Sequence, residues 1–221
     1  MSRTASERLI WLRVIWLHVS CLRASWLRTM AVALAAVAAL AAGDGSAPRP
    51  AVPTRAEVQA RLARTGRGFS AGDVADLGSG AGGLLAQIAD DKAVAPPIRL
   101  RAMAALTYAR TPATHDFLES YLVRQRTSRD PVDRALLRKA AIALGWQSGP
   151  RTVEILAELL DHEDAEVRLD AVVALGLTRT RRAGKPLRDR LSIEPDVAVR
   201  AQIESQLRIL LGPEASAAAP D

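Results

Sequence analysis

A spacing of small apolar residues that recurs four times constrains this fold more than any other feature. In residues 161–176, DHEDAEVRLDAVVALG, such residues stand at offsets 0, +4, +7 and +8 from Val167, which places one stripe along one side of a helix. The four sets are Ile98, Ala102, Ala105 and Leu106; Leu136, Ala140, Ala143 and Leu144; Val167, Ala171, Ala174 and Leu175; and Val199, Ile203, Gln206 and Leu207. The leading residue recurs after 38, 31 and 32 positions. A helix repeated at this period predicts an all-α fold, an α-solenoid of about four helical hairpins.

Composition supports closely packed helices and argues against a nucleic-acid partner. Hydrophobic residues make up 49% of the chain, but aromatic residues only 4%, which suits helices that approach closely better than a β-sandwich. The formal charge of +6 is uneven, because residues 1–42 hold five arginines and one acidic residue. The remainder has 25 basic and 23 acidic residues, so we expect no nucleic-acid partner. The single cysteine, Cys21, excludes an intrachain disulfide.

Residues 1–42 are expected to be a signal peptide. Arg23 and Arg28 precede an apolar run, residues 30–43, that ends in small residues. The run is shorter than the roughly 20 residues of a spanning helix. We therefore expect export to the periplasm or the medium, with an uncleaved membrane anchor at residues 30–43 as the alternative. Upstream, Trp-Leu-Arg-like triplets recur every five residues, a period that keeps no single face on a helix or strand. We expect that the true start lies after Met1.

The rest of the chain divides by composition and by helix signals. Residues 43–53 read as a Pro/Ala/Gly linker, residues 54–83 as an N-terminal helical capping segment and residues 212–221 as a disordered tail. Thr54 and Glu57 predict a capping box. The repeats are expected over residues 84–211, as hairpins of 84–89 with 98–110, 112–126 with 132–146, 151–160 with 165–178, and 184–191 with 197–211.

Glycine and polar residues mark expected ends within this scheme. Gly145 and Gly176 each follow Ala-Leu and are expected to stop their helices. In the last unit, polar side chains replace apolar ones and are expected to cap the outer side of a terminal repeat. They are Gln202, Glu204, Ser205 and Gln206.

The third unit resembles a known repeat family. Val167-Arg168-x-x-Ala171-x-x-Ala174-Leu175-Gly176 after an acidic turn is similar to the HEAT repeat, in particular the short subtype first associated with phycobilisome bilin lyases. Ile98-Arg99 and Val199-Arg200 match its Val-Arg pair, whereas the second unit has Leu136-Leu137. The resemblance covers about residues 84–211. It implies that such arginines pair with turn carboxylates of neighbouring units, and anion binding is the alternative. The expected structural ladder is Arg99, Asp164, Arg168, Asp196 and Arg200.

The sequence offers little for catalysis or metal binding. One branch of the family consists of metal-dependent hydroxylases with several His-Glu pairs, but outside the leader this chain has only His115 and His162. Two imidazoles cannot supply such an iron set, and a zinc site fails by the same count. No G-x-S-x-G and no cysteine outside the leader indicate a nucleophile. We therefore expect no catalytic residue, no metal and no cofactor.

The expected function is that of a non-catalytic, exported scaffold for a protein or peptide partner. In stacks of this family the second helices usually line the concave side, so the residues at offsets +2 and +3 are expected to face the partner. They are Leu100, Arg101, Arg138, Lys139, Leu169, Asp170, Ala201 and Gln202. A bilin-lyase-like activity, or another enzyme or chaperone of HEAT type, is the alternative. The sequence does not identify the partner.

Overall fold

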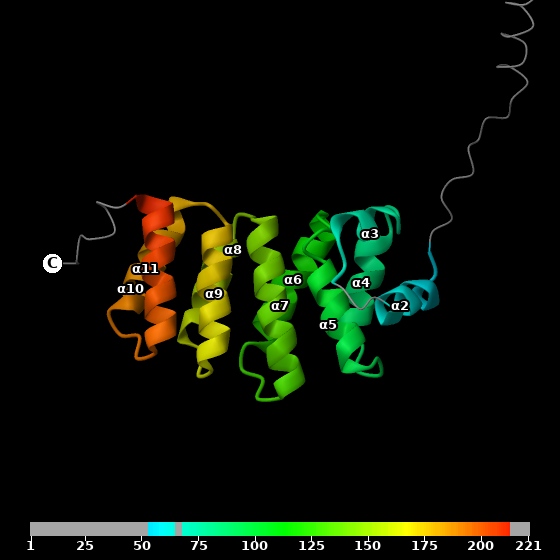
Figure 1. Ribbon diagram of the computed structural model, residues 1–221, viewed down its shortest axis with the longest axis horizontal. Helices are drawn as coiled ribbons and strands as arrows, with labels where there is room; N and C mark the ends of the chain where they lie inside the picture. Colours follow the sequence, from blue (N-terminus) through cyan, green and yellow to red (C-terminus); the bar gives the residue numbers. More distant parts are fainter. Residues whose placement is uncertain (1–52, 65–67, 213–221) are drawn as a thin grey trace, which may run out of the picture. The chain divides into compact units, whose positions relative to one another are not determined.

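The four apolar stripes lie on the second helices of four consecutive hairpins (Figure 1). The computed structural model describes residues 53–64 and 68–212, which belong to one compact unit. The expected signal peptide, nearly all of the linker and residues 213–221 of the expected tail lie outside these residues. In the described ranges every regular element is a helix, as the stripes predict. No helix of these two ranges has the length and apolar character needed to cross a membrane.

The helix boundaries agree closely with the expected hairpins. The N-terminal segment forms α2 (Arg55–Arg64) and α3 (Ala71–Ala75). The hairpins are α4 (Ala81–Asp90) with α5 (Pro96–Ala105), α6 (Pro112–Gln125) with α7 (Pro131–Gln147), α8 (Thr152–Glu158) with α9 (Ala165–Leu177), and α10 (Gly184–Leu191) with α11 (Val197–Leu211). A 3₁₀ turn, Leu159–Asp161, follows α8, and another, Arg181–Ala183, precedes α10. The first hairpin thus begins three residues before the expected position, and its second helix ends five residues earlier.

Local side-chain hydrogen bonds begin these helices. The Thr54 amide donates to the Glu57 carboxylate at 2.7 Å and the Glu57 amide to the Thr54 hydroxyl at 3.3 Å, the predicted capping box. Three second helices begin at an aspartate whose carboxylate accepts backbone N–H groups of the first turn. These residues are Asp130, Asp164 and Asp196. Each therefore satisfies N–H groups that have no partner within the helix.

The hairpins stack as two rows of helices (Figure 1). The second helices form one row, in which α5 packs on α7, α7 on α9 and α9 on α11, while α4, α6 and α8 pack in a row behind. The turns within hairpins (residues 91–95, 126–130, 161–164 and 192–196), called the hairpin edge below, lie along the lower side in Figure 1. The turns between hairpins (residues 106–111, 148–151 and 178–183), the link edge, lie along the upper side.

The apolar stripes form the core between the rows. Fourteen of their sixteen residues are buried, and the exceptions are Ile98 and Gln206, which are half-buried. In the second unit Leu137 is fully buried at the position that Arg99 and Arg168 hold in their units. Apolar packing there replaces the arginine of the Val-Arg pair.

Gly145 and Gly176 lie inside α7 and α9, so the expectation that they stop their helices is wrong. A Cβ atom at Gly145 would lie 2.5 Å from the Ala174 carbonyl oxygen of α9, and one at Gly176 would overlap the Gln206 side chain of α11. Gly145 is therefore required for the close approach of α7 and α9, whereas at Gly176 the flexible Gln206 side chain could move aside. The left-handed backbone comes three residues later, at Ser148 (φ 45°) and Arg179 (φ 53°).

The two ends of the stack differ. At the N-terminal end α2 packs on α4 and α5, and Arg55 forms an ion pair with Asp91. At the C-terminal end Glu204 of α11 is exposed, whereas the residues at the same offset in the first three units, Met103, Ala141 and Val172, are buried. Gln206, expected on the outer side, instead faces Gly176 of α9. The expected polar cap is therefore corrected at that residue, whose amide fills the space that the glycine leaves.

Candidate partner-binding face

The row of second helices turns three columns of side chains toward solvent. Counted from the first residue of each stripe, these are the residues at offsets +3, +6 and +10, whereas those at +4 and +8 are buried in every unit. Offsets of 3, 6 and 10 share one face of a helix because 3.6 residues make one turn. The expected residues at offsets +2 and +3 thus lie on or beside this face.

Arg101 contacts the capping helix of its own chain. Its Nη1 atom donates to the Leu62 carbonyl oxygen at 2.8 Å, at the C-terminal end of α2. A guanidinium at the last carbonyl groups of a helix satisfies acceptors that have no partner within that helix. Arg101 therefore attaches the capping helix to the first hairpin.

Arg138 and Asp170 are bound to each other. Arg138 Nε donates to Asp170 Oδ2 at 2.6 Å, and its Nη1 contacts the Glu166 carboxylate. The two acids belong to α9, so the guanidinium of α7 joins successive second helices. Arg138 and Asp170 therefore join two layers of the stack, and their charges largely neutralise each other.

The remaining expected residues divide by burial. Leu100 and Leu169 are half-buried and pack against the core. Gln202 is half-buried and Ala201 exposed. Lys139 is exposed and has no acidic partner within 4 Å among the residues that the structure describes. Of the charged residues in this set, Lys139 alone is therefore available for contact.

A column of large apolar side chains at offset +10 was missed by the sequence interpretation. It consists of Tyr108 (45% exposed), Trp146 (40%), the half-buried Leu177 and Ile209 (71%). Ile142 and Val173, both half-buried, stand beside it at offset +6. These six residues are called the apolar ribbon below. The sequence could have indicated this column, because offset +10 lies on the same helical face as offset +3. The expected partner-facing residues covered offsets +2 and +3 alone.

Arginines without carboxylate partners border the apolar ribbon on the link edge. The Arg110 guanidinium carbon lies 5.9 Å from the centroid of the Trp146 ring, a cation–π contact. Arg151, Arg179 and Arg181 are exposed, and no ion pair is found for them in the described part of the chain. Arg182 forms an ion pair with Glu154. The link edge is consequently basic beside an apolar surface.

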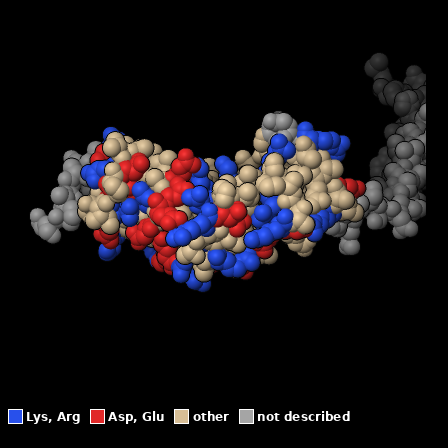
Figure 2. All heavy atoms as spheres, turned by 90° about the horizontal axis from the view of Figure 1, so that it is seen from below, with Lys and Arg blue, Asp and Glu red and all other residues tan. Residues whose placement is uncertain are grey.

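The hairpin edge has the opposite character. Figure 2 shows acidic and basic side chains side by side over this edge, with Asp and Glu gathered near its middle. The second and third units meet there through arginines of one and acids of the other. The pairs are Arg126 with Glu158, Arg129 with Glu163, Arg134 with Asp164, and Arg138 with Glu166 and Asp170. Each connects successive units, so the charges of this edge hold the stack together.

The arginines of the Val-Arg pairs contact carbonyl groups of their own hairpins and, in two units, an acid of the next. Arg168 Nη1 donates to the His162 carbonyl at 2.9 Å, and its Nε and Nη2 donate to Glu194 at 2.9 and 2.7 Å. Arg99 Nε donates to the Ala89 carbonyl, and its Nη2 lies 3.7 Å from Asp133 Oδ1. The expected ladder is therefore corrected in its acids. Asp164 and Asp196 cap their helices, and the acids that reach the arginines are Glu194, two residues before the cap Asp196, and Asp133, three residues after the cap Asp130.

Arg200, in the last unit, donates to the Leu191 and Glu194 carbonyls at 3.0 and 3.3 Å. Among the described residues no later unit presents an acid to it.

Glu194, the buried acid that Arg168 contacts, also accepts a hydrogen bond from Arg190 Nε at 2.7 Å. Burial by itself would raise the pKa of Glu194, but hydrogen bonds from Arg168, the Asp196 amide and Arg190 outweigh it and lower that pKa to about 2.

Both histidines contact neighbouring polar groups of the chain. His162 Nδ1 accepts the Asp164 amide at 3.0 Å, and burial lowers the pKa of His162. His115 lies 3.9 Å from Glu119 and 3.4 Å from the Thr152 hydroxyl. Within residues 53–64 and 68–212, no group of three or more His, Cys, Asp or Glu side chains could hold a metal ion.

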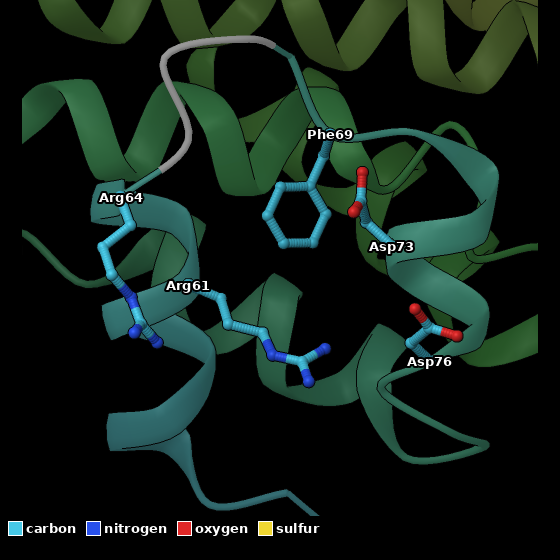
Figure 3. A pocket seen from close by; sticks show the side chains of 5 residues that line it. All are labelled: Arg61, Arg64, Phe69, Asp73 and Asp76. Atoms are coloured by element: carbon cyan, nitrogen blue, oxygen red, sulfur yellow. The ribbon is translucent and has the colours of Figure 1, made fainter.

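Two hollows in the surface lie away from the apolar ribbon. One of about 260 Å³ lies on the hairpin edge among Arg126, Arg129, Asp161 and Glu163, residues that take part in ion pairs. The other, of about 300 Å³, lies in the N-terminal segment, where Arg61 and Phe69 point toward the space between α2 and α3 (Figure 3). Its arginines and aspartates carry opposite charges, so it selects neither anions nor cations.

The comparisons with known proteins agree with the stack. Residues 124–208 match a family model described as HEAT repeats. No curated protein matches this chain at a significant level. The match is to HEAT repeats in general, and the resemblance to the bilin-lyase subtype stays a prediction. HEAT repeats commonly serve as protein-interaction scaffolds. With this match, residues 124–208 are HEAT repeats, and they lie within a stack of four helical hairpins.

Proposed function

We propose that this chain is a non-catalytic scaffold that binds a protein or peptide segment across its second helices. The apolar ribbon carries the proposal. Three of the six large hydrophobic side chains that are exposed in the described residues, Tyr108, Trp146 and Ile209, occupy the same offset in three different units. Aromatic side chains at the surface of a rigid stack are typical of protein-binding hot spots. A ribbon across successive layers suits an extended or helical segment laid along the stack.

Residues that the stack uses internally are excluded from this surface. Arg101, Arg138 and Asp170 contribute to stability, and their substitution would disturb layers rather than report on binding. The partner-binding residues proposed here are therefore the apolar ribbon together with Lys139 and Gln202.

A photo-crosslinking comparison tests the proposal. A benzophenone amino acid is placed at Trp146, at Ile209 or at Val123, and cells that make each chain are irradiated. Val123 is a matched control, because it is 44% exposed but lies on α6 in the other row. We expect the same discrete adduct from Trp146 and Ile209 and none from Val123. Equal adducts from all three positions, or adducts from Val123 alone, would reject the second-helix face.

Export through residues 1–42 is a separate proposal. It is supported by the charged, apolar and small-residue segments of that sequence. Fractionation of cells with sequencing of the mature N-terminus tests it. We expect the protein in the exported fraction with a new N-terminus near residue 43. Recovery of chains that still begin before residue 30 would contradict cleavage.

A further inference from the structure

We infer that the segment bound along the apolar ribbon is acidic, with carboxylates directed to the arginines of the link edge. The inference rests on the proposed function and specifies its partner. It depends on a separation of charge between the two edges of the stack, on the position of the free arginines, and on one unfavourable backbone conformation.

The turns of the link edge and the residues next to them are mostly basic, and two of their basic residues pair with acids just beyond them, Arg182 with Glu154 and Lys185 with Asp189. Neither Asp nor Glu occurs in residues 106–115, 146–153 or 178–188, which contain seven arginines and lysines. They are Arg110, Arg151, Arg179, Arg181, Arg182, Lys185 and Arg188. The hairpin edge, by contrast, pairs its arginines with carboxylates of the next unit. Positive charge therefore accumulates on one edge, although the repeats as a whole are close to neutral.

The basic link edge is continuous with the apolar ribbon. Each second helix ends at an apolar-ribbon residue or within three residues of one, and in the first three units the turn that follows belongs to the link edge. Arg110 lies against the Trp146 ring, which joins the two surfaces directly. A ligand on the ribbon thus meets apolar side chains on one side and guanidinium groups on the other. Electrostatic complementarity favours a peptide with apolar residues on one face and carboxylates beside them.

Arg179 is held in an unfavourable conformation at this edge. Its φ of 53° lies in the left-handed region, where glycine is favoured and an arginine costs roughly 1–2 kcal/mol. The side chain is exposed and has no ion pair within the described residues, so no internal contact explains the arginine. Strain of this kind concentrates where a side chain is retained for function.

Peptide binding tests the inference with a defined probe. The probe is a labelled helical peptide of Leu and Glu at amphipathic spacing, and two further peptides have Gln or Lys in place of every Glu. Fluorescence anisotropy with the full chain is expected to give a Kd about tenfold lower for the Glu peptide than for the Gln peptide, and the weakest binding for the Lys peptide. Equal affinity for the three peptides, or no binding of the Glu peptide, would overturn the inference.

Variants locate the contact. The double variant Arg151→Glu, Arg181→Glu is expected to raise the Kd of the Glu peptide about tenfold, because two attractive contacts become repulsive. Arg129→Glu is the matched reversal on the hairpin edge, where the exposed pair with Glu163 is weak, and is expected to change its Kd less than twofold. Arg179→Gly relieves the left-handed strain and removes one guanidinium. It is therefore expected to raise the melting temperature and to raise the Kd of the Glu peptide. If Arg129→Glu weakens binding as much as the double variant, the link edge is not the contact.

Two further outcomes separate this inference from the proposed function. Trp146→Ala adds no charge and should weaken binding of all three peptides, and if it weakens none, the apolar ribbon is wrong. If Trp146→Ala weakens binding but the arginine reversals do not, only the acidic character of the partner fails. Vesicles of phosphatidylglycerol and a single-stranded RNA are run beside the peptides. If either binds more tightly than the Glu peptide, and through Arg151 and Arg181, the inference of an acidic peptide partner is wrong and the link edge binds another polyanion.

Discussion

The Glu194 carboxylate is completely enclosed between Arg168 and Arg190, and it joins the third unit to the fourth. A buried ion pair of this kind is weak evidence for net stability, since removing two charges from water is costly. Loss of one partner is different, because it leaves the other charge buried without compensation. The contact therefore adds one buried carboxylate to the apolar packing of α11 on α9.

Glu194→Gln is expected to lower the free energy of unfolding by roughly 3 kcal/mol, since it leaves the Arg168 guanidinium without its counter-charge. Chemical denaturation followed by circular dichroism measures the change. Glu204→Gln is the control, because Glu204 is exposed on α11, and we expect a change within about 0.5 kcal/mol. Equal effects of the two substitutions would show that the buried pair contributes nothing special.

The pH dependence of stability follows from the same carboxylate. The pKa of Glu194 is about 2 in the folded chain against an ordinary 4.5, so its stabilisation is fully present above pH 4.5 and is lost as the pH falls toward 2. His162, whose pKa burial lowers below 6.5, adds a loss in the same direction at higher pH. The difference in unfolding free energy between the wild type and Glu194→Gln should shrink between pH 4.5 and pH 3. A difference that stays constant over this range would contradict the assignment.

At the scale of elements, the distance between second helices is set by glycines inside them. Gly145 meets the α9 backbone and Gly176 meets Gln206 of α11, at the same offset in successive units. A side chain at Gly145 would push two layers apart, whereas one at Gly176 would first displace the Gln206 side chain. The stack therefore depends on small residues where helices cross, as well as on the buried stripes.

Gly145→Ala is expected to destabilise the chain by about 1–3 kcal/mol, although alanine is the better helix former, because its Cβ would press on rigid backbone. Gly83→Ala provides the comparison. Gly83 is an exposed residue of α4, and a Cβ atom added there would meet no atom within 4 Å, so helix propensity should raise stability by up to about 1 kcal/mol. Thermal melts of both variants measure this contrast. Stabilisation by Gly145→Ala would mean that α7 and α9 lie farther apart than in this structure.

The sequence predicted the elements well because their signals are local. Stripe periodicity and the capping box of Thr54 and Glu57 depend on neighbours along the chain, and the hairpins that the stripes predicted were confirmed. Contacts between units could not be predicted in the same way. The choice of Glu194 over Asp196 by Arg168, and the use of Arg101 to hold α2, depend on how two layers pack. The apolar ribbon was predictable in principle, since offsets +6 and +10 fall on one helical face, although Tyr108 lies three residues beyond the end of α5.

At the scale of the whole described stack, the surfaces divide the tasks. The hairpin edge carries ion pairs between units, the stripes and glycines bring the rows together, and the second-helix face with the link edge remains available to a partner. The chain thus stabilises its layers on one edge and leaves apolar and basic side chains on another. This arrangement is the physical basis of the proposed scaffold.

A pair of distances between spin labels tests the ordered ribbon most directly. The labels are attached to cysteines in a Cys21→Ser background, at Trp146 and Ile209 in one chain and at Tyr108 and Ile209 in another. Packed helices lie about 8–10 Å apart, so two layers should separate the first pair by about 20 Å and three layers the second by about 30 Å. A Tyr108–Ile209 distance no longer than the Trp146–Ile209 distance would contradict a stack in which these side chains form one ribbon.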